Sequence, residues 1–106
     1  MAVTRFEWDP QKDRLNRLKH GVGFVEAQYA FADAQRVIAQ DLSHGSVENR
    51  YYCFWRVGDG VMTVRFTFRA GVIRIFGAGY WRRGRQIYEH ENQIRRRIPR
   101  DAESGP

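Results

Sequence analysis

The sequence has 106 residues, of which 42% are hydrophobic, and a formal net charge of +6 at pH 7. This length predicts a single domain, and no apolar run approaches the roughly 20 residues that a transmembrane helix needs. The N-terminus lacks an apolar signal region, so we expect a cytoplasmic protein. The single cysteine, Cys53, excludes an internal disulfide and a cysteine-rich metal site, and its apolar surroundings predict an inert core thiol.

The positive charge is concentrated in the second half of the chain. Residues 1–50 contain seven basic and seven acidic side chains, whereas residues 51–106 contain eleven arginines and five acidic side chains. Only two of the eighteen basic residues are lysines. Arginine's planar fork suits bidentate phosphate contacts and stacking on bases, although an arginine bias can also follow from genomic base composition. The charge favours a polyanionic partner, with nucleic acid as the leading candidate.

A short strand over residues 4–8 and a helix over about residues 10–20 are predicted at the start of the chain. Asp9 is suited to accept backbone N–H bonds as the N-cap, and Pro10 fits the first helical position. Gly21 supplies the left-handed residue that ends a helix. Both ends of this helix are therefore specified by the sequence.

The remaining pattern predicts an α+β domain over residues 1–98. The expected elements are a second helix over residues 24–32, strands over 36–40, 50–57, 61–69 and 72–79, and a third helix over 81–97. This order implies a four- or five-stranded, mainly antiparallel sheet. Residues 99–106, which begin with the helix-stopping Pro99, are expected to form a disordered tail.

The strand over residues 61–69 alternates between apolar and polar positions, which places Arg65 and Arg69 on one face. In a meander these arginines line up with Arg74, and with Arg50 or Arg56. Adjacent cations repel one another unless an anion lies over them, and a phosphodiester would satisfy this arrangement. The alternative is that each arginine pairs with an acidic side chain, for which the candidates are Asp41, Glu48, Glu89 and Glu91.

Two glycines and an apolar seam complete the expectations for the end of the domain. Gly77 and Gly79 suggest a bulge or a close backbone approach near the end of the last strand. Gly84 weakens the first turn of the third helix. The apolar seam of this helix is predicted to consist of Ile87, Tyr88, Ile94 and Ile98.

Lys19 and His20 lie in the last turn of the first helix, whose buried side is marked by Leu15 and Leu18. Lys19 supplies a fixed positive charge and His20 an imidazole, so the pair could stabilise a phosphorane and transfer a proton. Cations in a last helical turn are also favoured by the helix dipole alone. Both interpretations stay open at the level of the sequence.

Several further polar side chains are weaker candidates. Glu48 could act as a base or could orient Arg50, and Tyr88 could be a residue at the edge of the core with a solvated hydroxyl. His44 and His90 do not stand at metal-ligand spacing with other ligands, so no metal site is expected. The sequence contains neither a glycine-rich phosphate loop nor a Ser/His/Asp pattern.

With these residues identified, the chain resembles the BrnT family of type II toxins over roughly residues 5–92. The opening signature is Phe6-x-Trp8-Asp9-Pro10-x-Lys12-x3-Asn16-x2-Lys19-His20-Gly21-x2-Phe24-x-Glu26-Ala27. The match continues through Phe31-x-Asp33, Asp41-x2-His44-x3-Glu48-x-Arg50, Thr67-x-Arg69, Arg74-Ile75 and Tyr88-Glu89.

The resemblance implies a compact RelE-like fold with two N-terminal helices, and an endoribonuclease that inhibits translation by cleaving RNA without a metal or cofactor. It also implies a BrnA-like antitoxin as partner, with operator DNA bound only through the antitoxin complex. The catalytic positions that carry over are Lys19, His20, Glu48, Arg50, Arg69 and Arg74. In the mechanism that these positions suggest, either His20 or Tyr88 would protonate the leaving 5′-oxygen. The expected RNA-binding residues are Arg65, Arg82, Arg83 and Arg85.

One departure from the family pattern concerns the residues after the last strand. Many members carry Ser-Ala-Arg there, whereas this sequence has Gly77-Ala78-Gly79. Arg82 or Arg83 could reach the space of the missing arginine. The alternative function is a catalytically weak or inactive basic module that binds an antitoxin or nucleic acid.

Overall fold

The computed structural model describes residues 4–43 and 48–97. Its elements are β1 (Arg5–Glu7), α1 (Pro10–His20), α2 (Phe24–Ala27), η1 (Gln28–Ala32), β2 (Val37–Asp41), β3 (Arg50–Val57), β4 (Gly60–Arg69), β5 (Val72–Tyr80) and α3 (Arg82–Arg97). These bounds agree with the predicted ranges to within one residue. The expected tail and His44 lie outside the described residues. None of the helices in the described part of the chain is long and apolar enough to cross a membrane.

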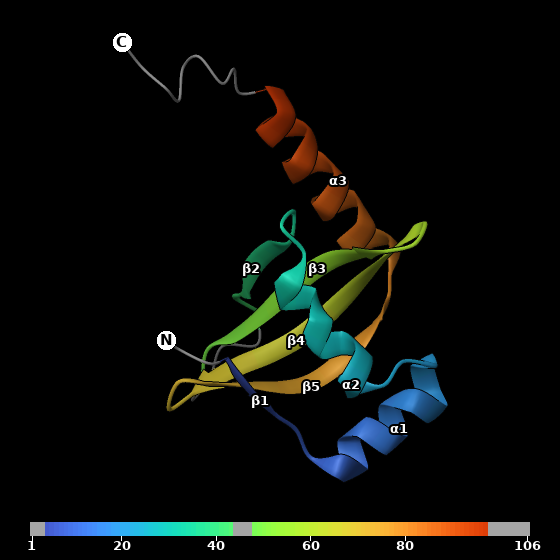
Figure 1. The fold of residues 1–106 in the computed structure, drawn as a ribbon, viewed down its shortest axis with the longest axis vertical. Helices are drawn as coiled ribbons and strands as arrows, with labels where there is room; N and C mark the ends of the chain where they lie inside the picture. The colour runs from blue at the N-terminus through green and yellow to red at the C-terminus, as the bar shows by residue number, and fades with distance from the viewer. Residues whose placement is uncertain (1–3, 44–47, 98–106) are drawn as a thin grey trace.

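A five-stranded sheet forms the centre of the fold, with the strand order β1-β5-β4-β3-β2 (Figure 1). The first strand, β1, pairs in parallel with β5, and the other neighbouring strands pair antiparallel. The predicted α+β class and mainly antiparallel sheet are therefore confirmed.

The main core lies between the sheet and the segment formed by α2 and η1, which crosses one face of the sheet (Figure 1). Phe24 of α2 and Phe66 of β4 are fully buried there. Cys53 is also fully buried, as predicted, and burial raises the pKa of its thiol to about 12. The predicted second helix is correct in extent, but only its first four residues are α-helical, and Gln28–Ala32 tighten into a 3-10 helix.

Helix α1 begins and ends as predicted, but it is held in place by polar contacts. Asp9 Oδ1 accepts the N–H of Gln11 at 2.8 Å, and Gly21 has the left-handed φ of 71°. The prediction that Leu15 and Leu18 face the core is wrong, because their exposed fractions are 56% and 75% and no residue of α1 is buried. The helix lies beside β5 at the margin of the sheet (Figure 1), so no second layer covers its apolar stripe.

Two polar side chains on the inner side of α1 fasten it to the rest of the domain. Asn16 donates hydrogen bonds to the carbonyls of Val22 at 2.8 Å and Ala78 at 2.9 Å, and accepts the N–H of Ala78 at 3.3 Å. Asp13 accepts the N–H of Phe24 at 2.7 Å. These bonds fix the helix that carries Lys19 and His20 against the end of β5.

Helix α3 covers one end of the opposite face of the sheet and then extends beyond it (Figure 1). Tyr88 is buried against Val37 and Phe54, with Ile87 partly buried beside it. The expected seam is wrong at Ile94, which is 42% exposed, and the end of α3 extends beyond the sheet (Figure 1). The fourth seam residue, Ile98, lies outside the described residues.

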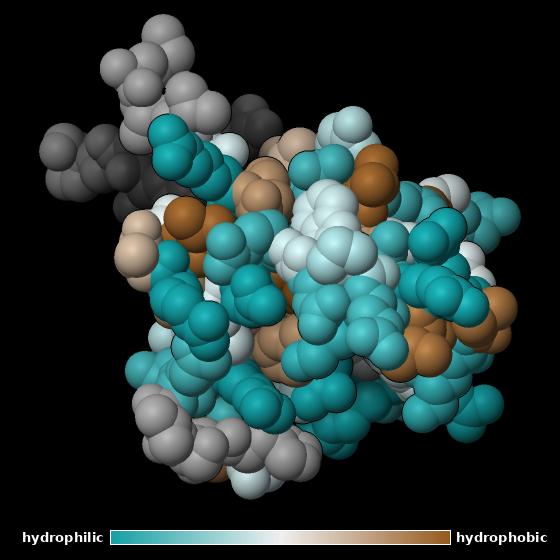
Figure 2. Space-filling model, turned by 90° about the horizontal axis from the view of Figure 1, so that it is seen from below, coloured by the Kyte–Doolittle hydropathy of each residue, from teal (hydrophilic) through white to brown (hydrophobic). Residues whose placement is uncertain are grey.

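The exposed apolar side chains are spread over several elements. Leu15 and Leu18 lie on α1, Val25 and Tyr29 on the segment of α2 and η1, and Phe68 on β4. The view in Figure 2 shows a mostly hydrophilic surface on which apolar side chains form separate patches. The main surface feature to explain is therefore its charge.

Candidate functional site

Four arginines from three neighbouring strands share the face of the sheet that α2 and η1 leave uncovered. We call the set of Arg50, Arg65, Arg69 and Arg74 the arginine face. In the register, Arg50 lies opposite Thr67, which in turn lies opposite Arg74, so these side chains point to one side. Arg56 points to the same side but lies at the other end, with its guanidinium 5.4 Å from the ring centroid of Tyr88. The predicted alignment with Arg50 is therefore confirmed.

A β-bulge in β5 places an aromatic ring between two of these arginines. Arg65 lies opposite Gly77 but Phe66 lies opposite Ile75, so Phe76 is the extra residue, as the nearby glycines suggested. The guanidinium carbons of Arg50 and Arg65 lie 5.1 and 5.0 Å from the Phe76 ring centroid. Cation–π attraction holds both cations beside this ring. Among the described residues, neither arginine forms an ion pair with a carboxylate.

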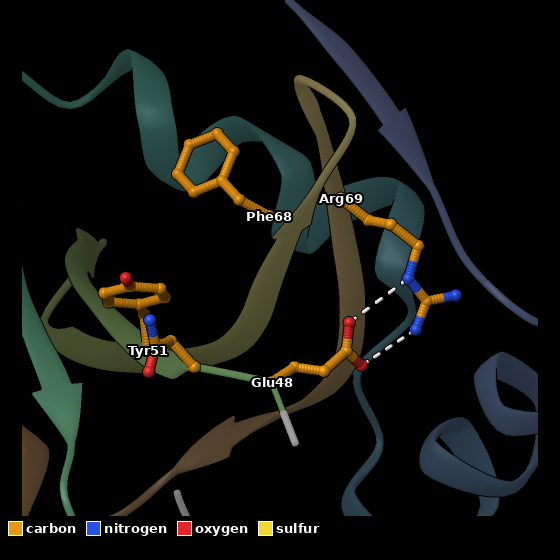
Figure 3. A pocket seen from close by; sticks show the side chains of 5 residues that line it. Glu48, Tyr51, Phe68 and Arg69 are labelled. Carbon is orange, nitrogen blue, oxygen red and sulfur yellow. Dashed lines mark hydrogen bonds and ion pairs between the residues drawn. The ribbon is translucent and has the colours of Figure 1, made fainter. Parts of the chain in front are cut away.

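Glu48 lies within the arginine face and forms a bidentate ion pair (Figure 3). Its two carboxylate oxygens accept hydrogen bonds from Arg69 Nη2 at 2.8 Å and Nε at 3.1 Å. The bond from Arg69, with the charges of Arg50 and Arg74 nearby, lowers the pKa of Glu48 below its usual range. The expectation that Glu48 orients Arg50 is wrong, because the carboxylate of Glu48 accepts its hydrogen bonds from Arg69.

Arg74 also pairs with a carboxylate, but not with one of the predicted acids. Its Nη1 donates to Glu7 Oε1 at 3.1 Å, across the parallel pair of β1 and β5. The arginine face thus contains two paired cations, Arg69 and Arg74, and two that are held by an aromatic ring. All these interactions are at least partly exposed, so an incoming phosphate can exchange with them.

The end of α1 meets the arginine face at a groove of about 340 Å³, which we call the α1 groove. Its lining includes Lys12, Lys19 and His20 from α1, and Arg65, Phe76 and Trp81 from the sheet side. The imidazole of His20 and the indole of Trp81 form a T-shaped pair, with ring centroids 5.2 Å apart. Lys19 and His20 therefore share one hollow with Arg65.

A second groove of about 480 Å³, the α3 groove, runs along the start of α3. Arg83 lines it together with Arg65, Trp81 and Tyr52. Arg65 and Trp81 belong to both grooves, so they stand at the junction between them.

The other candidates on α3 lie in different surroundings. Arg82 is exposed, and Arg85 is paired with Glu89 at 3.3 Å. Tyr88 is only 2% exposed, and its hydroxyl donates to Asp33 Oδ2 at 3.0 Å. The structure does not bring Tyr88 to either groove, and its hydroxyl is bound rather than solvated.

Two contributors to these grooves, Phe76 and Trp81, are not among the site residues predicted from the sequence. The sequence pattern places Phe76 only within the strand over residues 72–79, and Trp81 only at the start of the third helix. The signal available for Phe76 was the break in the period of β5. Within the described residues, no three or more His, Cys, Asp or Glu side chains are grouped so that they could hold a metal ion.

The family model of the ribonuclease toxin BrnT of type II toxin–antitoxin systems matches residues 8–84. The chain belongs to this family. None of the curated protein sequences matches it significantly. The matched range contains α1, the whole arginine face and the BrnT signature around Lys19 and His20. Membership in the BrnT family makes RNA the expected target and implies an antitoxin partner.

Proposed function

We propose that the chain is a metal-independent endoribonuclease whose reaction takes place where the α1 groove meets the arginine face. The observation that carries this proposal is the junction at Arg65. This guanidinium lines the α1 groove with Lys19 and His20, and it shares the Phe76 ring with Arg50 of the arginine face. A phosphodiester bound there would meet fixed cations and a proton-transfer group together.

In the proposed reaction, the 2′-oxygen of a ribose attacks the adjacent phosphorus while a base removes the 2′-hydroxyl proton. The bond to the 5′-oxygen of the next nucleotide breaks, that oxygen takes up a proton, and a 2′,3′-cyclic phosphate and a free 5′-hydroxyl result. Lys19, Arg50, Arg69 and Arg74 stabilise the negative charge that develops on the phosphorane. Such electrostatic stabilisation is usually the largest single contribution to catalysis.

The contacts favour His20 over Glu48 as the proton-transfer group. The carboxylate of Glu48 accepts two hydrogen bonds from Arg69, and its lowered pKa makes it a weaker base than an ordinary glutamate. The His20 ring is exposed at the α1 groove and contacts only Trp81 among the described aromatic rings. We assign Glu48 the role of positioning Arg69. We leave Tyr88 out of the reaction, because its buried hydroxyl is bound to Asp33.

The partner we propose is a BrnA-like antitoxin, which would reach operator DNA on behalf of the complex, and the place of action is the cytoplasm. An acidic antitoxin segment would complement the exposed arginines of α3, among them Arg82 and the last-turn residues Arg95–Arg97.

Cleavage of a defined RNA by the purified chain in the presence of EDTA tests the activity. We expect cleavage with the chelator present, and a loss of about 100-fold in Arg69→Ala, the usual cost of removing one transition-state donor. His20→Ala should lose activity to a similar or greater extent. Absence of cleavage, or unchanged cleavage in both variants, contradicts the mechanism.

A second candidate is the catalytically weak binding module, and one observation favours it. Gly79 stands where the BrnT resemblance leads us to expect an arginine, so the site has one cation fewer. Induction of the gene without an antitoxin gene distinguishes the two candidates, because we expect the ribonuclease to arrest growth and a module that only binds to leave growth unchanged. A protein that only binds RNA should instead show an affinity that falls steeply with salt and leave no cleavage products.

A further inference from the structure

The indole of Trp81 occupies the space that a side chain at position 79 would fill. A Cβ on Gly79 would lie 2.6, 2.8 and 2.9 Å from three carbons of this ring, closer than atoms pack in proteins. Gly79 is not among the glycines with positive φ, so its backbone conformation does not require glycine. The close approach of Trp81 is therefore the physical reason for glycine here.

The packing of its ring against Gly79 places Trp81 at the centre of the candidate site. The ring packs against His20 in a T-shaped arrangement, with ring centroids 5.2 Å apart, and it lines both the α1 groove and the α3 groove beside Arg65. Trp81 is 40% exposed and belongs to neither of the two hydrophobic clusters. Its ring therefore does more than fill the core.

The other aromatic rings of the two grooves are already engaged. Phe76 has the guanidinium groups of Arg50 and Arg65 against it. Tyr52 is stacked on Phe54 at 5.8 Å and donates its hydroxyl to Asp41. Trp81 packs on Gly79 and contacts only His20 among the described aromatic rings, and 40% of its surface remains exposed at the junction beside Arg65.

We propose that Trp81 is a stacking platform for a base of single-stranded RNA, and that the adjacent phosphate binds at Arg65 and the arginine face. This inference rests on the proposed function, because it takes RNA as the ligand. Aromatic side chains bind bases without strong sequence preference, since every base has a π-face, and cations beside them bind the backbone. The pair of Gly79 and Trp81 thus replaces the cation expected at position 79 with a ring that binds a base.

The test compares two noncleavable ligands of equal length and charge. One is a 2′-O-methyl oligonucleotide, and the other is the same sugar–phosphate chain with every base removed. Fluorescence anisotropy of labelled ligands gives the affinity of each for the wild type, Trp81→Ala and Trp81→Phe. The wild type should lose about 10-fold in affinity when the bases are absent, the usual cost of one stacked base. Trp81→Ala should bind both ligands equally, and Trp81→Phe should keep part of the difference.

Gly79→Ala provides an independent variant that leaves the indole present but displaces it. It should reproduce the loss seen for Trp81→Ala, and the double variant should bind no more weakly than Trp81→Ala alone. A larger loss of affinity in the double variant would show that Gly79 acts independently of Trp81. That result would contradict the inference that Gly79 serves to make room for the Trp81 ring. Thermal unfolding of each variant verifies that the fold is kept.

The stacking inference fails if the wild type binds both ligands equally, or if Trp81→Ala retains the preference for bases. Cleavage of ordinary RNA by the wild type in EDTA reports separately on the proposed function. If the protein cleaves RNA but shows no preference for the ligand with bases, only the stacking inference is contradicted. A base preference without cleavage removes only the ribonuclease activity and leaves a base-stacking RNA-binding module.

Discussion

Glu48 holds Arg69 by two hydrogen bonds of 2.8 and 3.1 Å, so one cation of the candidate site is already occupied by a carboxylate of the same chain (Figure 3). Both side chains are substantially exposed, which makes the pair weak in net free energy and exchangeable. A phosphate that binds Arg69 therefore competes with Glu48. The Glu48 carboxylate thus occupies the position on Arg69 that a phosphate of the ligand would take.

Replacing Glu48 by Gln should strengthen RNA binding, because it frees Arg69 and removes a negative charge beside Arg50 and Arg74. One added phosphate contact steepens the dependence of log affinity on log salt by about 0.7 for a single strand. Anisotropy titrations with a noncleavable oligonucleotide at several salt concentrations measure both effects. Cleavage should fall in the same variant, because Arg69 loses the group that positions it.

Glu26→Gln is the matched control, since it changes the net charge equally. Glu26 lies on α2, on the other side of the sheet, and forms no ion pair within the described part of the chain. Equal affinities for the two variants would show that only the net charge matters and that Arg69 is not a ligand of the phosphate.

Local signals in the sequence predicted most of the fold. Asp9 and Gly21 fix the ends of α1 through short-range backbone chemistry, and the alternation along β4 fixes which side each arginine faces. The same local logic failed for Leu15 and Leu18, whose spacing is that of a buried stripe. Periodicity cannot say whether another layer covers a helix, and here the margin of the sheet leaves α1 uncovered.

The parts of the candidate site that could not be predicted depend on contacts between distant residues. Asn16 forms a hydrogen bond with Ala78, which is 62 residues away in the sequence. Glu48 bonds with Arg69, 21 residues away, although Arg50 is nearer in the sequence. The extra residue of the bulge, Phe76, joins two arginines from other strands. Trp81 folds back onto Gly79 only because a glycine leaves room for it.

Asn16→Ala should reduce cleavage more than it reduces stability. The variant loses the bonds from Asn16 to Val22 and Ala78, at a cost of about 1–3 kcal/mol in the free energy of unfolding. Because α1 buries no side chain, it should then move relative to β5 and displace Lys19 and His20. A displacement of about 1 Å can cost up to about 100-fold in rate.

Hydrogen exchange along α1, thermal unfolding and the cleavage rate together measure this effect. Gln11→Ala on the same helix is the control, since the described residues give the Gln11 side chain no hydrogen bond. If Asn16→Ala and Gln11→Ala cleave RNA equally fast, the hydrogen bonds of Asn16 do not position Lys19 and His20 for cleavage.

The hydrogen bond between Tyr88 and Asp33 should make stability depend on pH at both extremes. Burial raises the pKa of Asp33, but bonds from the N–H groups of Gln35 and Arg56 and from Tyr88 lower it overall below the ordinary 3.8. Its contribution is therefore present above pH 3.8 and is lost as the pH falls through the lower folded value. Burial and Asp33 raise the pKa of Tyr88 above 10.0, so its contribution is lost as the pH rises through that higher value.

Denaturant midpoints measured across the pH range test this dependence. Tyr88→Phe should lower the free energy of unfolding by about 1 kcal/mol near neutral pH. It should also show a smaller decrease in stability at alkaline pH than the wild type. Tyr29→Phe, on the exposed side of η1, should change neither quantity. An alkaline limb in Tyr88→Phe as steep as in the wild type would assign that limb to other groups.

Gly84→Ala should destabilise the protein, although helix propensity alone predicts a gain of about 1 kcal/mol. A Cβ on Gly84 would overlap Thr63 Oγ1 and lie 2.9 Å from Phe54 Cδ1, so α3 would have to move away from the sheet. Overpacking of this kind costs about 1–3 kcal/mol. Gln86→Ala, an exposed change on the same helix, controls for propensity, and thermal unfolding measures both.

Thr63→Ala removes the overlapping hydroxyl, so the double variant should recover part of the loss relative to Thr63→Ala alone. A higher midpoint for Gly84→Ala than for the wild type would mean that α3 does not rest on Thr63 as tightly as these contacts require.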